Sequence, residues 1–235
     1  MDWSAALRNA LPPPAHRTAA PSAADWTAAE AALGVTLPAD YKQFLSDWGP
    51  AQIGAFFYTL SPGHPNRVVE LVEKARYVTY ALGTLKAHHP RTYTAPVFPE
   101  EGGFLAWGLT DNGDFLGWMV TGRDPAAWPA AVWGEEDGTP EVFEGTGFGA
   151  LMAGIVTGTI RPAAFPDDVW DEVPLTMEPL GPSEAGGGGR VTPDAVRPNR
   201  AGVGVRRWRA GSPTTVAEWR EDQLGLLGRS NPLTS

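Results

Sequence analysis

Carboxylate side chains are the most concentrated chemical feature of this sequence. Ten of them lie between residues 92 and 160, against one basic side chain, Arg123. This stretch accounts for almost all of the formal net charge of −9. A coherent negative potential of this kind attracts basic partners and raises their rate of encounter by roughly 10- to 1000-fold. The candidate partner-binding residues are therefore the acids Glu100, Glu101, Asp111, Asp114, Glu135, Glu136 and Asp137.

Paired carboxylates also raise the possibility of acid–base catalysis. Glu100-Glu101 and Glu135-Glu136-Asp137 are the two runs of adjacent acids among the candidates. Neighbouring residues on a strand point to opposite faces, so neither run forms a catalytic pair by spacing alone. Taken singly, each of these acids is expected to be a solvated loop charge. A hydrolase would need a cleft that holds two carboxylates with perturbed pKa values.

The segment Asp111-Asn112-Gly113-Asp114 places several oxygen ligands close together. Calcium takes six to eight oxygens, and the spacing of an EF-hand loop is missing here. Asn-Gly between two β-prone segments is instead a strong signal for a tight hairpin, and it favours the positive φ angles of a type I′ turn. The sequence therefore predicts a turn rather than a metal site.

No other segment has the residues that catalysis or cofactor binding requires. Gly145 to Gly149 opens a predicted helix, but it lacks both the dinucleotide-binding glycine pattern and the lysine of a P-loop. The four histidines have no metal-ligand spacing, and the chain contains no cysteine. We expect no catalytic residue, no metal site and no cofactor.

The elements that must position the acids follow from apolar spacing and from capping residues. Helices are predicted over residues 2–11, 22–33, 39–48, 66–87 and 148–157, with Ser22 and Gly34 at the two ends of the second. Strands are predicted at 52–60, 95–98, 103–108, 115–120, 129–133 and 140–144. Strands that cluster in sequence with short connections indicate an antiparallel, meander-like sheet. The expected class is α+β: about five to six strands packed with N-terminal, middle and C-terminal helices.

Both ends of the chain are expected to lie outside the main domain. Residues 1–21 read as an extension with a short helix, and 22–165 as the domain. Residues 166–235 are rich in glycine and proline and are expected to be largely flexible, with a possible short helix at 214–227. Arginines give 190–209 a charge of +5, which fits a linker, an RNA-contacting arm or a strap over the acidic sheet.

Two segments of the proposed domain contain residues whose order and spacing are typical of one protein family. The first holds Trp26, Glu30, Leu33-Gly34, Leu37-Pro38, Tyr41, Phe44-Leu45 and Gly49; the second runs from Trp107 to Trp118 and continues with Trp128-Pro129, Phe148 and Leu151. Together they resemble the SUKH superfamily, which includes the Smi/Knr-type proteins. The resemblance implies an α+β fold and, in bacteria, a frequent role as an immunity protein that neutralises a cognate polymorphic toxin. Fungal members of the family are linked instead to regulation of cell-wall synthesis.

Charge and composition narrow the classes of partner. The net negative charge argues against nucleic acid as the primary partner, because phosphates demand basic patches. The N-terminus has no signal-peptide pattern, no segment reads as a membrane span, and the lack of cysteine suits a reducing cytoplasm. The favoured hypothesis is an immunity protein that binds a basic, nuclease-type toxin. The alternatives are a cytoplasmic scaffold or regulator of the same fold and, less favoured, a hydrolase.

Overall fold

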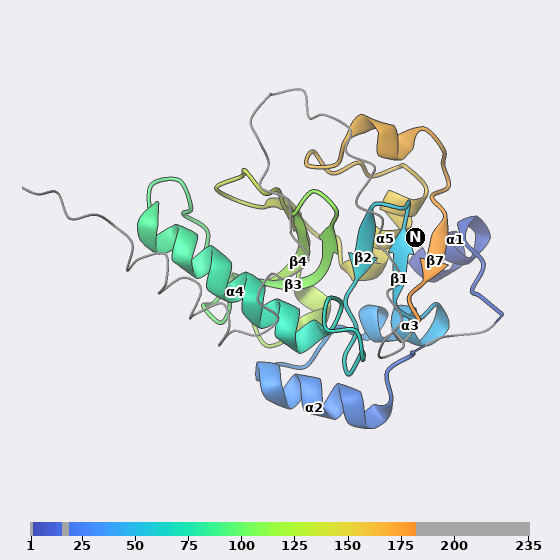
Figure 1. Ribbon diagram of the computed structural model, residues 1–235, viewed down its shortest axis with the longest axis horizontal. Coiled ribbons are helices and arrows are strands. Elements are labelled where there is room, and N and C mark those ends of the chain that lie inside the picture. The colour runs from blue at the N-terminus through green and yellow to red at the C-terminus, as the bar shows by residue number, and fades with distance from the viewer. Residues whose placement is uncertain (1, 16–18, 182–235) are drawn as a thin grey trace, which may run out of the picture. The chain divides into compact units, whose positions relative to one another are not determined.

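Seven short strands form one antiparallel sheet in the computed structural model, which describes residues 2–15 and 19–181 (Figure 1). Their order across the sheet is β6-β5-β4-β3-β2-β1-β7. The strands are β1 (Ala51–Ile53), β2 (Phe57–Thr59), β3 (Gly103–Thr110), β4 (Phe115–Val120), β5 (Ala130–Trp133), β6 (Glu141–Phe143) and β7 (Met177–Pro179). Strands that follow one another from β1 to β6 are neighbours in space, so the predicted antiparallel meander and α+β class are confirmed.

Two of the predicted strands differ in the structure, and one strand was not predicted. The segment 52–60 is a hairpin of β1 and β2, because the chain reverses at Gly54 and Ala55, which both have positive φ angles. The segment 95–98 forms no strand and contributes one bridge between Val97 and Phe104. The strand β7 was not predicted, because it has only three residues and one of them is Pro179.

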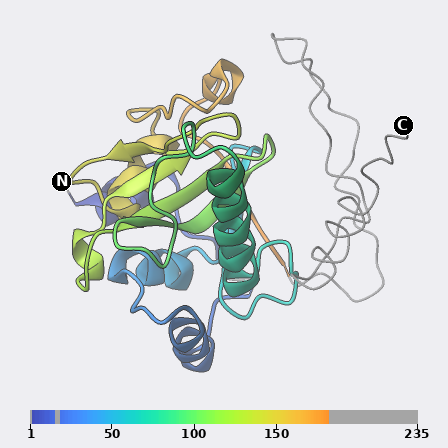
Figure 2. The same ribbon diagram turned by 90° about the vertical axis from the view of Figure 1, so that its left-hand side faces the viewer.

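Helices cover both faces of the sheet. The described residues contain α1 (Trp3–Ala10), α2 (Ala23–Leu33), α3 (Ala39–Asp47), α4 (Leu71–His88) and α5 (Phe148–Val156), with short 3₁₀ turns at Pro125–Ala127 and Asp167–Trp170. Alternate residues of a strand point to opposite faces. Trp118 therefore packs with α3 and α5, and the adjacent Met119 packs with α4. The helix α4 accordingly lies on the face opposite α3 and α5 (Figure 2).

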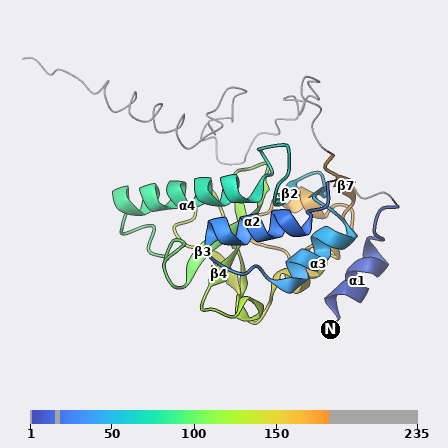
Figure 3. The same ribbon diagram turned by 90° about the horizontal axis from the view of Figure 1, so that it is seen from below.

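Local signals in the sequence set the ends of α2. Ser22 and Asp25 form a capping box, and Gly34 ends the helix at a φ angle of 74°. The helix then lies beside α4 (Figure 3), where Arg76 donates a hydrogen bond to the carbonyl oxygen of Ala32 at 3.1 Å. Both predicted caps are confirmed. Within the two described ranges, no helix is long and apolar enough to cross a membrane.

The N-terminal helix α1 is part of the fold rather than an extension of it. Leu7 is fully buried, and the ring of Trp3 lies directly over Gly149 in α5. The Trp48 indole also donates a hydrogen bond to the carbonyl oxygen of Leu11 at 2.9 Å. The expected start of the domain at residue 22 is therefore too late, because α1 buries its apolar side against α5.

The fold also continues past residue 165. Trp170 stacks on Phe165 with 6.0 Å between ring centroids, and Leu175 is buried. The strand β7 then pairs with β1, with Gln52 opposite Glu178. Residues 166–181 therefore belong to the folded unit. The helix predicted at 214–227, the arginine-rich segment 190–209 and all of the predicted flexible tail from residue 182 onward lie outside the described residues.

Candidate functional site

The turn between β3 and β4 holds two of the candidate acids, Asp111 and Asp114. The backbone N–H of Thr110 donates to the carbonyl oxygen of Asp114 at 3.0 Å, and that of Gly113 donates to Thr110 at 3.2 Å. Gly113 has a φ angle of 97°, whereas Asn112 does not have a positive φ angle. The predicted type I′ turn is therefore wrong. The loop has three residues, with glycine in the left-handed position that closes such loops.

Asp114 joins this turn to the end of β5. Its side chain is only 4% exposed. One carboxylate oxygen accepts from the Thr110 hydroxyl at 2.7 Å, and the other accepts from the backbone N–H of Glu135 at 3.1 Å. Burial raises the pKa of Asp114 despite these hydrogen bonds. Both oxygens are engaged within the protein, so Asp114 positions the site rather than presenting a charge to a partner.

The turn after β5 presents three further acids to solvent. Glu135, Glu136 and Asp137 are exposed. The turn is held by the Trp133 indole, which donates to the carbonyl oxygen of Asp137 at 2.7 Å. The Glu135 side chain lies over Gly113, since a Cβ atom at that glycine would be 3.3 Å from Cδ of Glu135. Partial burial and the charges of Asp114 and Glu136 raise the pKa of Glu135.

Five of the seven candidate acids are thus brought together at one end of the sheet. We call this group the acidic end; its members are Asp111, Asp114, Glu135, Glu136 and Asp137. Among the described residues, no lysine or arginine forms an ion pair with any of them. Other acids do have such partners, as in Lys42–Glu30 at 2.6 Å and Arg67–Glu73 at 2.8 Å. The charge of the acidic end is therefore left uncompensated by the surrounding described residues.

Glu100 and Glu101 lie elsewhere. They precede β3, where the backbone N–H of Gly102 donates to Val120 at the end of β4. The strand β3 has eight residues, which separates the two groups by roughly 25 Å at 3.3 Å per residue. Lys86 also pairs with Glu100 at 2.9 Å. The seven candidate acids therefore do not lie together on one face of the fold.

Tyr58 and Gln52 belong to the site and were not predicted. The Tyr58 hydroxyl donates to Oδ1 of Asp111 at 2.9 Å and accepts from Nε2 of Gln52 at 2.8 Å. Burial and the Asp111 charge raise the pKa of Tyr58 well above its ordinary value. Burial also raises the pKa of Asp111, which the Tyr58 hydrogen bond partly offsets. The alternation of residues 51–59 places Gln52 and Tyr58 on one face, but only the strand pairing brings Asp111 beside them.

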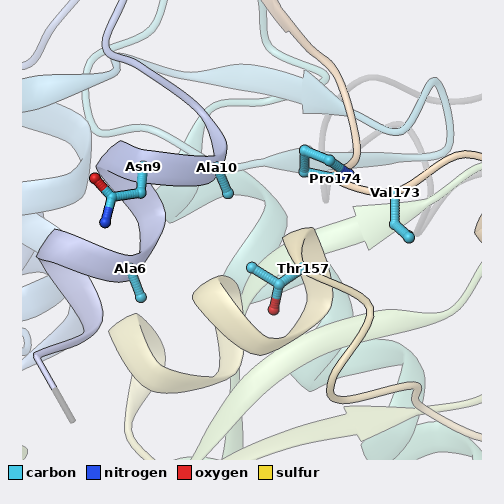
Figure 4. A pocket seen from close by; sticks show the side chains of 6 residues that line it. All are labelled: Ala6, Asn9, Ala10, Thr157, Val173 and Pro174. Carbon is cyan, nitrogen blue, oxygen red and sulfur yellow. The ribbon is translucent and has the colours of Figure 1, made fainter.

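Two cavities lie away from the acidic end. The larger has a volume of about 470 Å³ and opens between α1, the end of α5 and the segment around Pro174 (Figure 4). Its lining side chains, which include Asn9, Thr157 and Val173, contain no titratable group. The smaller, about 210 Å³, lies at the N-termini of α3 and α5. There Asp40 accepts from the backbone N–H of Gly149 at 2.8 Å. Neither cavity contains a pair of carboxylates.

The described part of the chain contains no group of three or more histidine, cysteine, aspartate or glutamate side chains arranged to hold a metal ion. Gly147 is the N-cap of α5, and β6 leads into that helix, as the glycine-rich link predicts. Trp107, Trp118, Trp128 and Trp133 are all at most 2% exposed. These tryptophans are therefore core residues in the structure and do not present a binding surface.

Comparisons with protein-family models, with curated proteins and with solved structures give no match to this chain.

Proposed function

We propose that this chain is a cytoplasmic binding protein that recognises a basic protein partner through its acidic end, in the manner of an immunity protein that neutralises a toxin. One observation carries the proposal. Four exposed carboxylates, of Asp111, Glu135, Glu136 and Asp137, are fixed by turns at one end of a sheet, with no basic ion-pair partner among the described residues.

The physical basis is the cost of holding like charges together. Partial burial and neighbouring charges raise the pKa of Glu135, and burial raises that of Asp111. A basic surface that approaches the acidic end stabilises these ionised forms. Such complementarity mainly raises the association rate and selects the partner, whereas buried contacts supply most of the affinity.

Binding without catalysis fits the environment of these acids. Asp114 is buried, with both of its oxygens hydrogen-bonded, and Asp111 accepts from Tyr58. The two cavities described above contain none of the five acids. The raised pKa values have local causes in burial and like charge, which a binding surface also produces.

The direct test is a growth-rescue assay. The product of the gene beside this one would be expressed in a bacterial host, alone and together with this chain. We expect the neighbouring product to stop growth and this chain to restore it. The double variant D111N/E135Q should rescue less well than E100Q/E101Q, which removes the same charge from the other end of β3. A neighbouring product that is not toxic, or that this chain fails to neutralise, would favour a scaffold or regulator.

A further inference from the structure

One row of side chains crosses the sheet from β7 to β4. The strand register pairs Glu178 with Gln52, Gln52 with Tyr58, Tyr58 with Leu109, and Leu109 with Phe115. Directly paired residues of antiparallel strands point to the same face. The register therefore places all five on the face of Phe115, which belongs to the cluster around α4, and Tyr58 and Leu109 also contact the larger core cluster at the edge of that face.

The α4 helix covers only part of this face. Two of its buried residues, Val78 and Leu82, pack with Phe104 of β3 and Met119 of β4, and the other two, Leu71 and Ala75 in its first turns, belong to the larger core cluster. In Figure 1, α4 ends to the left of β2, β1 and β7, and in Figure 3 it ends to the left of β2 and β7. The row is accordingly half-buried from Gln52 to Phe115 and exposed at Glu178. We call this row the open sheet face.

The open sheet face joins the acidic end through hydrogen bonds. Gln52 donates to Tyr58, and Tyr58 donates to one oxygen of Asp111. Among the described residues, the second oxygen of Asp111 has no hydrogen-bond partner, and no lysine or arginine pairs with Glu178. A half-buried aromatic ring therefore lies beside a fixed carboxylate, with further acids on both sides of it.

These groups match the chemistry of arginine. Its planar guanidinium stacks on aromatic rings and donates in a fixed fork to carboxylates, which a lysine ammonium cannot do. Strand addition at the sheet edges fits less well. Both edge strands, β6 and β7, have three residues, and β7 contains Pro179, which cannot donate to a ladder.

We propose that the open sheet face is the docking surface for the partner, and that an arginine-bearing loop of a basic protein binds there, with its guanidinium stacked on the Tyr58 ring and donating to the second oxygen of Asp111. This inference rests on the proposed function and specifies where and how that binding occurs. Tyr58 supplies the ring and also positions the Asp111 carboxylate.

The test uses the full chain, labelled with ¹⁵N, and hexa-arginine as the probe at low salt. We expect amide shifts to concentrate at Gln52, Tyr58, Leu109, Asp111 and Glu135. The loss of one hydrogen bond to a charged group corresponds to roughly 10- to 100-fold weaker binding. D111N/E135Q should show a loss of at least this size, whereas E100Q/E101Q should stay close to the unsubstituted chain.

A second comparison tests whether the chain prefers arginine to lysine when the two peptides carry the same charge. Hexalysine should bind the unsubstituted chain several-fold more weakly than hexa-arginine. Tyr58→Leu keeps apolar bulk but removes the ring and the hydroxyl, so this preference should disappear. If Tyr58→Leu fails to fold, as judged by its spectrum, Glu136→Gln at an exposed position gives a milder second variant, which should weaken the binding of both peptides.

Shifts centred on Glu100 and Glu101, equal losses in the two double variants, or equal binding of the two peptides would overturn the proposal. The growth-rescue assay reports separately on the function. Rescue that persists in D111N/E135Q leaves the immunity role intact and refutes the docking surface. Localised, arginine-selective binding without rescue supports the docking surface and refutes the immunity role.

Discussion

At the scale of single residues, the acidic end shows how the fold holds charges that repel one another. Asp114 is buried and links two turns, while Asp111 is held by Tyr58. Both pKa values are raised, chiefly by burial. These carboxyls therefore oppose folding when they are ionised, and the fold tolerates them because hydrogen bonds fix their positions.

This arrangement has a consequence for stability against pH. A raised folded-state pKa means that the folded protein binds more protons than the unfolded chain. Proton binding at Asp114 therefore stabilises the folded state. This stabilisation is fully present below the unfolded-state pKa of about 4 and is lost as the pH rises through the folded-state pKa. Asp114→Asn should accordingly gain stability relative to the unsubstituted chain on going from pH 4 to pH 7.

Urea unfolding at the two pH values would measure this effect. Glu101→Gln removes the same charge from an exposed position and provides the control. Asp25 and Glu30, whose pKa values are lowered, act in the opposite direction in every variant and cancel in the comparison. A difference between Asp114→Asn and the unsubstituted chain that is the same at both pH values would contradict the account.

At the scale of elements, two glycines in helices make opposite packing demands. A Cβ atom at Gly83 in α4 would meet nothing within 4 Å, whereas one at Gly149 in α5 would collide with the Trp3 ring. Glycine in a helix interior costs roughly 0.5–1 kcal/mol relative to alanine. The first glycine is therefore a cost to α4, and the second is required by the packing of α1 on α5.

The same substitution should consequently have opposite effects at the two sites. Gly83→Ala is expected to raise the free energy of unfolding by about 0.5–1 kcal/mol. Gly149→Ala is expected to lower it by about 1–3 kcal/mol through overpacking. Chemical denaturation of the two variants gives both values. A neutral Gly149→Ala would mean that α1 does not pack against α5.

The segment before β7 provides a test of where the domain ends. Leu175 is 3% exposed, and its backbone N–H donates to Val156 at 2.8 Å. Leu175→Ala should therefore cost about 2–5 kcal/mol, as for other buried leucines. Val173→Ala, at an exposed position two residues earlier, serves as the control and should cost little. Equal small losses at both positions would place this segment outside the core.

Elements with strong local signals could be predicted from the sequence. The strand at 115–120 has the predicted bounds, and Ser22 and Gly34 cap α2 as expected. The β7 strand could not be predicted, because three residues ending in proline acquire their structure only by pairing with β1. The acidic end was predicted in part. Local spacing identified its residues, but only the length of β3 separates Glu100 and Glu101 from them.

At the scale of the whole molecule, charge and open surface coincide. Ten acids lie between residues 92 and 160, and the fold gathers five candidates at one end of the sheet. The open sheet face adjoins that end, where the Tyr58 hydroxyl donates to Asp111. The basic side chains that form ion pairs in the described residues do so with other acids. Within the described residues, negative charge without ion-pair partners therefore gathers at one end of the sheet, beside the open sheet face.

The most direct test of this account is the association rate constant with the partner found by growth rescue, measured by stopped flow at low and high salt. D111N/E135Q should associate at least several-fold more slowly than the unsubstituted chain at low salt, because charge steers the encounter. The difference should shrink at about 1 M salt, where the Debye length is about 3 Å. E100Q/E101Q should associate at close to the rate of the unsubstituted chain. Equal rates for the two double variants at low salt would contradict a binding role for the acidic end.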